Sequence, residues 1–115
     1  MKGLKFRQGD FYFFADIFYV LHVVALKDVK DELNEIEHIN FKQLLNSGKE
    51  PEEIIFIGKN RKILGLIVED ILEVADIENI SPFNNSDFAL DFIKGVIKVN
   101  NVIYYEIDCK KLVEG

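Results

Sequence analysis

Short apolar runs separated by turn residues dominate this chain. The runs are rich in Ile, Val, Phe and Tyr, which suit the pleated, half-buried surface of a sheet. The pattern therefore predicts strands at residues 4–7, 11–15, 18–27, 33–39, 54–57, 62–68, 71–77, 96–99 and 102–107. A polar hairpin tip is expected within residues 27–32. Strands at this spacing predict an all-β fold, built as a small barrel or sandwich.

Two short helices are expected to interrupt the strands, at residues 40–45 and 108–113. Asn40 opens the first and Asp108 opens the second. Either side chain can accept a hydrogen bond from an amide that the first helical turn leaves bare, so both residues are predicted to be structural helix caps. Gln43 adds a capping-box spacing, and Gly48 is placed to end the first helix.

An internal repeat links these helices to the strands before them. Residues 38–45 align with residues 106–113 without a gap, and residues 15–20 resemble residues 69–74 more loosely. The alternative is a chance similarity between short patterns. The repeat predicts a single domain made of two related halves, at approximately residues 1–50 and 51–115.

Composition and charge restrict the function classes. The chain has 115 residues, 49% of them hydrophobic, which is enough for one domain with its own core. Its formal net charge is −6 and it has no dense cluster of cations, which argues against nucleic-acid binding. Cys109 is the only cysteine, so neither an internal disulfide nor a multi-thiolate metal site is possible, and a small buried hydrophobe is the expected role.

The most apolar segment, residues 11–26, raises the question of a membrane span. Asp16 and His22 interrupt it, and it is shorter than the ~20 residues that a spanning helix needs. We therefore expect no membrane insertion and a cytoplasmic location.

Candidate chemistry is sparse. Neighbouring strand residues such as Glu69 and Asp70 point to opposite faces, and the two histidines lack metal-ligand spacing. The sequence predicts no catalytic, metal or cofactor site. The alternative from another class is a small hydrolase that uses Asp70, Asp91 or Asp108.

The second half carries a family resemblance. Residues 65–74 read Gly-Leu-Ile-Val-Glu-Asp-Ile-Leu-Glu-Val, and Ile80-Ser81-Pro82, residues 92–96 and residues 106–112 follow in order. These motifs resemble the second half of CheW-like chemotaxis coupling domains. The resemblance implies two packed small β-barrels of SH3-like type with short helices. The first half lacks the family's Gly-Val-Ile-Asn-Leu-Arg-Gly turn, so the first barrel is expected to be trimmed.

The resemblance also implies a function. CheW-like domains are non-catalytic adaptors in chemotaxis, a two-component signal-transduction system, where they couple the regulatory domain of a CheA-type histidine kinase to the cytoplasmic tip of chemoreceptors. Asp28, Asp31 and Glu32 stand where an arginine-bearing turn is expected, so receptor coupling is predicted to be weak. The alternative is a diverged CheW-like module that self-associates as a homo-oligomer or docks on another signalling protein. The candidate partner groove is lined by Val68, Glu69, Ile71 and Val74.

Overall fold

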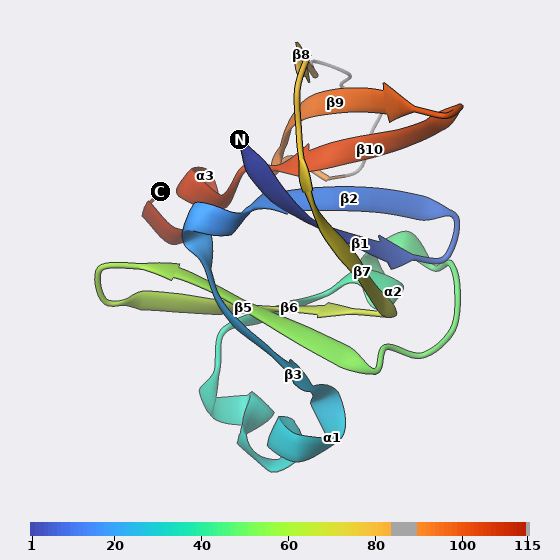
Figure 1. Ribbon diagram of the computed structural model, residues 1–115. Coiled ribbons are helices and arrows are strands. Elements are labelled where there is room, and N and C mark those ends of the chain that lie inside the picture. Colours follow the sequence, from blue (N-terminus) through green and yellow to red (C-terminus); the bar gives the residue numbers. More distant parts are fainter. Residues whose placement is uncertain (84–89, 115) are drawn as a thin grey trace.

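Two sheets form the body of the protein in a computed structural model that describes residues 1–83 and 90–114 (Figure 1). Within these residues the larger sheet has six strands and the smaller has four. The larger sheet contains, in spatial order, β7 (Asp70–Asp76), β1 (Lys2–Gln8), β2 (Phe11–Asp16), β10 (Val102–Ile107), β9 (Ile93–Val99) and β8 (Ser81–Pro82). The smaller sheet contains β3 (Val20–Ala25), β5 (Glu53–Lys59), β6 (Lys62–Val68) and β4 (His38–Asn40). The predicted all-β class with short helices is confirmed.

The chain crosses between the sheets twice. After β2 it passes through the 3₁₀ helix η1 (Ile17–Tyr19) and enters the smaller sheet as β3, antiparallel to β5. After β6 it returns to the larger sheet as β7, antiparallel to β1. These crossings lie at the two segments, residues 15–20 and 69–74, that the sequence aligns. Each sheet therefore takes strands from both sides of residue 50.

The core lies between the sheets. Phe6, Phe13 and Phe41 are fully buried, with ring centroids 5.1–5.6 Å apart. Buried aliphatic side chains of the smaller sheet pack against the same cluster: Ile55, Ile57, Leu64, Leu66 and Val68. Cys109 is buried with them, and this burial raises the pKa of its thiol to about 12. That environment fits the role of a small buried hydrophobe predicted for Cys109. The raised pKa keeps the thiol protonated at neutral pH.

The two capped helices occupy equivalent places. β4 runs parallel to β6 and leads into α2 (Phe41–Leu45), whereas β10 runs parallel to β2 and leads into α3 (Cys109–Glu114). Asn40 Oδ1 accepts a hydrogen bond from the amide of Gln43 at 3.2 Å, and Asp108 Oδ1 accepts one from the amide of Lys111 at 3.0 Å. Both residues hold the capping positions that the sequence predicts. Asn46, with φ of 49°, ends α2, so the prediction of Gly48 for this role is wrong.

The segment between residues 18 and 39 differs from the sequence prediction. Its expected long strands and hairpin tip are replaced by η1, β3, the helix α1 (Leu26–Val29), the 3₁₀ helix η2 (Lys30–Glu35) and β4. The cause is a set of apolar side chains at helical spacing that covers the outer face of the smaller sheet over Ile54, Phe56 and Ile67: Leu26, Val29, Leu33 and Ile36.

The expected shortening of the first half is found in the connection between β3 and β4. Twelve residues, 26–37, connect β3 to β4, whereas 25 residues, 77–101, connect β7 to β10. The longer connection forms β8 and β9, and β9 pairs with β10. Among the described residues β4 has β6 on one side and no strand on the other. In the part of the chain that the structure describes, the first half therefore has no counterpart of β9 or β8.

No helix among the described residues is long and apolar enough to cross a membrane.

We expect the two caps to contribute independently to stability. Asn40→Ala and Asp108→Ala should each lower the free energy of unfolding by about 0.5–2 kcal/mol, because each removes the acceptor for one helical amide. The losses should add in the double variant, since the caps serve helices attached to different sheets. Urea denaturation monitored by circular dichroism measures all three, with Asn34→Ala, an exposed asparagine in η2, as the control. The expectation would be contradicted if the double variant were as stable as the less stable of the two single variants.

Candidate functional site

The corner between β6 and β7 is fixed by the buried carboxylate of Glu69. Its Oε1 accepts hydrogen bonds from the amides of Gly9 and Lys49, both at 3.0 Å, and its Oε2 lies 2.7 Å from the Arg7 guanidinium. The hydrogen bond from the Lys49 amide, with help from Gly9 and the Arg7 charge, outweighs burial and lowers the pKa of Glu69. Arg7 also pairs with Asp70. This one residue therefore joins the β1–β2 turn, the loop after α2 and the start of β7.

The contact between the turn and the loop has no room for side chains. Gly9 and Gly48 both have positive φ, and a Cβ atom on Gly48 would lie 2.2 Å from Glu69 Oε1 and 2.5 Å from Gly9 Cα. Gln8, which is fully buried, fastens the same contact by donating from Nε2 to the carbonyls of Ser47 and Lys49 at 2.8 and 3.0 Å. Glycine is needed at both positions because the backbones touch.

These contacts change the candidate groove. Val68 is 0% exposed and Glu69 is 7% exposed, so neither offers surface to a partner, and the prediction that they line a groove does not fit their burial. These two residues are buried because the corner they form packs against the turn at residues 8–10 and the loop at residues 46–50. Ile71 is half-buried and packs against the core, whereas Val74 is 51% exposed.

The accessible part of the candidate site is one edge strand. β7 is the outermost strand of the larger sheet on its side, and its Leu72 is 41% exposed. Val74 pairs with Leu4 and Ile71 pairs with Phe6, both of which face the core. We define the β7 surface as Ile71, Leu72 and Val74. Sequence reasoning missed Leu72. Neighbouring strand residues such as Ile71 and Leu72 are predicted to point to opposite faces, but nothing in the sequence indicates that β7 is an edge strand.

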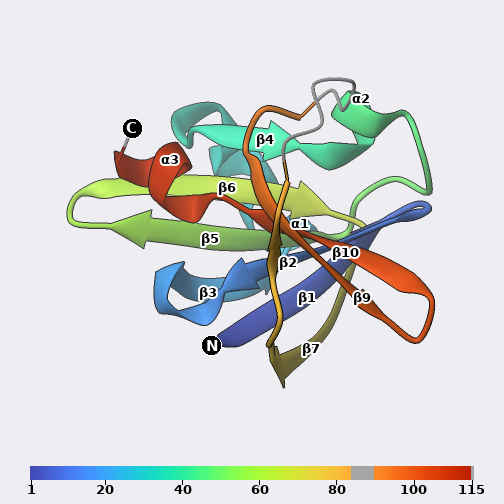
Figure 2. The ribbon, with the colours of Figure 1, turned by 90° about the horizontal axis from the view of Figure 1, so that it is seen from above.

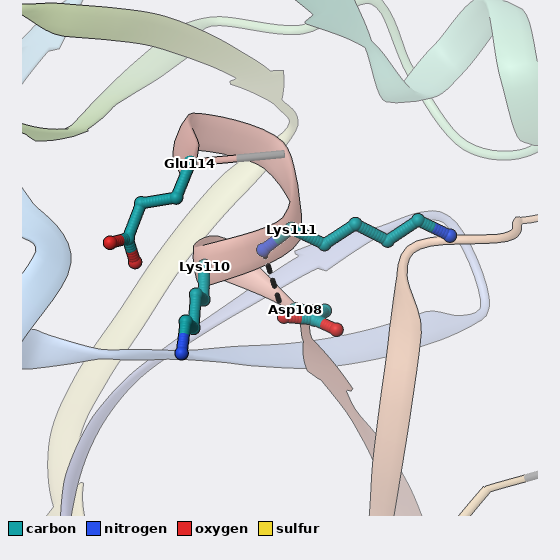
Figure 3. Close-up of a pocket in the computed structure, with 4 residues that line it drawn as sticks. All are labelled: Asp108, Lys110, Lys111 and Glu114. Atoms are coloured by element: carbon teal, nitrogen blue, oxygen red, sulfur yellow. Dashed lines mark hydrogen bonds between the residues drawn. The ribbon is translucent and has the colours of Figure 1, made fainter.

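The carboxylates considered for hydrolysis have separate structural partners. Asp70 pairs with Arg7 on the larger sheet. Asp91 lies 3.9 Å from the ammonium of Lys111, and Asp108 caps α3. Around that cap the side chains extend from α3 in different directions, as Figure 3 shows for Lys110, Lys111 and Glu114. Over residues 1–83 and 90–114, no three His, Cys, Asp or Glu side chains are grouped as metal ligands.

Comparison with known proteins identifies the fold. No protein-family model matches the chain, and no curated protein matches it. Among solved structures, the crystal structure of the scaffolding protein CheW from Thermoanaerobacter tengcongensis is similar, with a TM-score of 0.70 and 23% sequence identity. The alignment covers 92% of this chain and 87% of that one. The predicted CheW-like fold is therefore confirmed.

The Glu69 contacts predict a pH-dependent stability. The pKa of Glu69 is lower in the folded state than in the unfolded state, so its stabilisation is fully present above its ordinary value of 4.5 and is lost as pH falls through the lowered folded value. Glu69→Gln should lower the free energy of unfolding by about 3 kcal/mol at pH 7. Below pH 5 the free energy of unfolding should fall less steeply with decreasing pH in this variant than in the unchanged protein. Urea denaturation from pH 3 to 8 measures both effects.

Asp70→Asn is the matched control, because it removes the other carboxylate from Arg7. The Asp70 side chain is 48% exposed, so this change should cost less than about 1 kcal/mol. Equal losses from the two variants would contradict the central role of Glu69.

Proposed function

We propose that this protein is a non-catalytic, cytoplasmic adaptor in chemotaxis-type signal transduction. The observation that carries the proposal is the exposed apolar β7 surface on a CheW-like fold. A solvated edge strand with apolar side chains suits pairing or packing with another protein. The similar solved protein is named a scaffolding protein, which supports the same class of function.

The first partner we propose is the regulatory domain of a CheA-type histidine kinase. The β7 surface would supply the contact through Leu72 and Val74, with half-buried Ile71 at its base. The bonds of Glu69 and Arg7 hold the first residues of β7 in place, so the strand is ordered before a partner arrives. Pre-ordering reduces the entropy that binding must overcome.

The second proposed partner, the tip of a chemoreceptor, should bind weakly. The segment in the corresponding place is the short connection formed by α1 and η2, and its exposed side includes Asp28, Asp31 and Glu32. Each Å² of apolar contact that is missing there removes ~25 cal/mol of binding free energy. Carboxylates also reject acidic groups on a partner, which changes specificity.

Calorimetric titration tests the kinase interaction. Val74→Glu should weaken binding to the regulatory domain of the CheA-type kinase from the same organism by at least tenfold, because it places a charge in an apolar contact. Ile103→Glu is the matched control, since Ile103 is 45% exposed on β10, away from β7. Unchanged affinity for the Val74 variant, or equal loss for both, would refute the β7 surface as the contact.

The receptor interaction needs its own titration, against a chemoreceptor tip fragment. We expect binding at least tenfold weaker than that of the kinase domain. Replacing Asp28, Asp31 and Glu32 together by Asn, Asn and Gln should strengthen it, because the like charges are removed. Tight receptor binding by the unchanged protein, together with absent kinase binding, would contradict the proposed function.

A further inference from the structure

The outer side of β4 borders an open groove of about 450 Å³. Apolar residues on four segments line it: Ile39 in β4, Leu44 in α2, Phe92 before β9 and Leu112 in α3. Leu44 is 48% exposed, an unusual position for a leucine at the end of a helix so close to the core. Figure 2 shows α2 at the end of β4. The groove thus combines an apolar lining with the edge of a sheet.

The main chain of β4 leaves hydrogen-bonding groups directed at this groove. The Gly65 amide donates to the Glu37 carbonyl at 2.9 Å, so Glu37 and, two residues on, Ile39 direct their main-chain groups toward β6. His38 lies between them and must direct its N–H and C=O to the opposite side. Its imidazole Nδ1 is 2.7 Å from the Ile36 carbonyl, so the ring turns back along its own chain.

The larger sheet shows what fills the equivalent position. Glu106, which aligns with His38, pairs with Gly95 of the antiparallel strand β9. In β9 two buried residues, Ile93 and Ile97, are each followed by an exposed lysine, Lys94 and Lys98. Sheet edges with apolar surroundings recruit strands of other chains when no strand of their own covers them.

Charge around the groove favours a basic strand. Asp91 is in its lining and exposed, and Glu35 and Glu37, which directly precede β4 in the sequence, are exposed as well. Of the nearby cations, Lys111 already donates to the Asp91 carbonyl at 2.8 Å, and Lys42 is half-buried. Complementary charge steers a partner and fixes its register.

We propose that β4 accepts an antiparallel strand from another protein, with alternating apolar and basic side chains, in the position that β9 occupies beside β10. The apolar side chains of this strand enter the groove over Leu44 and Phe92, and its main chain bonds to His38. The proposal does not rest on kinase coupling, because β4 and β7 are edges of different sheets.

A peptide with the sequence of residues 92–100 of this chain, acetylated and fluorescently labelled, is a suitable probe. Fluorescence anisotropy should show saturable binding to the full-length protein. A matched peptide with Glu at both Lys positions should bind at least tenfold more weakly. Hydrogen exchange should show slower exchange of the His38 amide when the first peptide is bound.

Two variants locate the site. His38→Pro removes an N–H that faces the groove rather than β6, so the fold should persist while peptide binding falls at least tenfold. Leu44→Glu should do the same by placing a carboxylate in the groove, and Ile103→Glu should leave peptide binding unchanged. Circular dichroism checks that each variant is folded.

Several outcomes would overturn the proposal. One is the absence of saturable binding, and another is binding that neither folded variant weakens. A third is a dimer in sedimentation equilibrium that His38→Pro dissociates and the peptide does not displace, because a second copy of the chain would then occupy the edge.

Discussion

The arrangement of both sheets depends on one buried carboxylate. Glu69 sits where the chain leaves the smaller sheet for the larger one, and it satisfies two main-chain amides and one guanidinium from segments 20 to 62 residues away. Buried amides without acceptors are costly, so the loops that provide them can close only around this residue. The direction of β7, and with it the accessible apolar edge, follows from that closure.

The consequence for function is that the candidate interface is built on a rigid support. For the proposed adaptor role, affinity depends on how much disorder binding must remove. In this protein the strand that offers Leu72 and Val74 begins at a salt bridge and pairs with β1 on both sides of one register shift. Side chains placed in this way need little rearrangement on binding.

The sequence predicted the second half well because its signals are local. The runs at residues 62–68 and 102–107 have the bounds of β6 and β10, and Asp108 sits at the helix start that its side chain favours. Residues 18–39 failed because β-branched residues suggested strands, whereas Leu26, Val29 and Leu33 recur at helical spacing. The helical conformation is stabilised by packing on the outer face of the smaller sheet. That face exists only after the sheet has formed, so local sequence does not reveal it.

The site was harder to predict than the fold. Both faces of the smaller sheet are covered, so residues 64–69 are buried without alternation and sequence gives no sign of which side meets solvent. The family resemblance places Val68 in a groove, whereas the structure places it in the core. Exposure along β7 depends on its place at a sheet edge, which is a property of the whole topology rather than of the residues in the strand.

The two crossings, in which β3 enters the smaller sheet and β7 enters the larger one, also limit how the sequence of such a chain can change. Removing either crossing strand would take the outermost strand from one sheet and break the passage of the chain between the two sheets. The connection after a crossing strand lies outside these crossings, at the periphery of a single sheet. A deletion there leaves the crossings and the core intact, and the shorter connection of 12 residues shows that the fold tolerates such a loss. Sequence variation in this architecture should therefore accumulate as gains and losses of outer strands, each of which creates or removes a place for a partner.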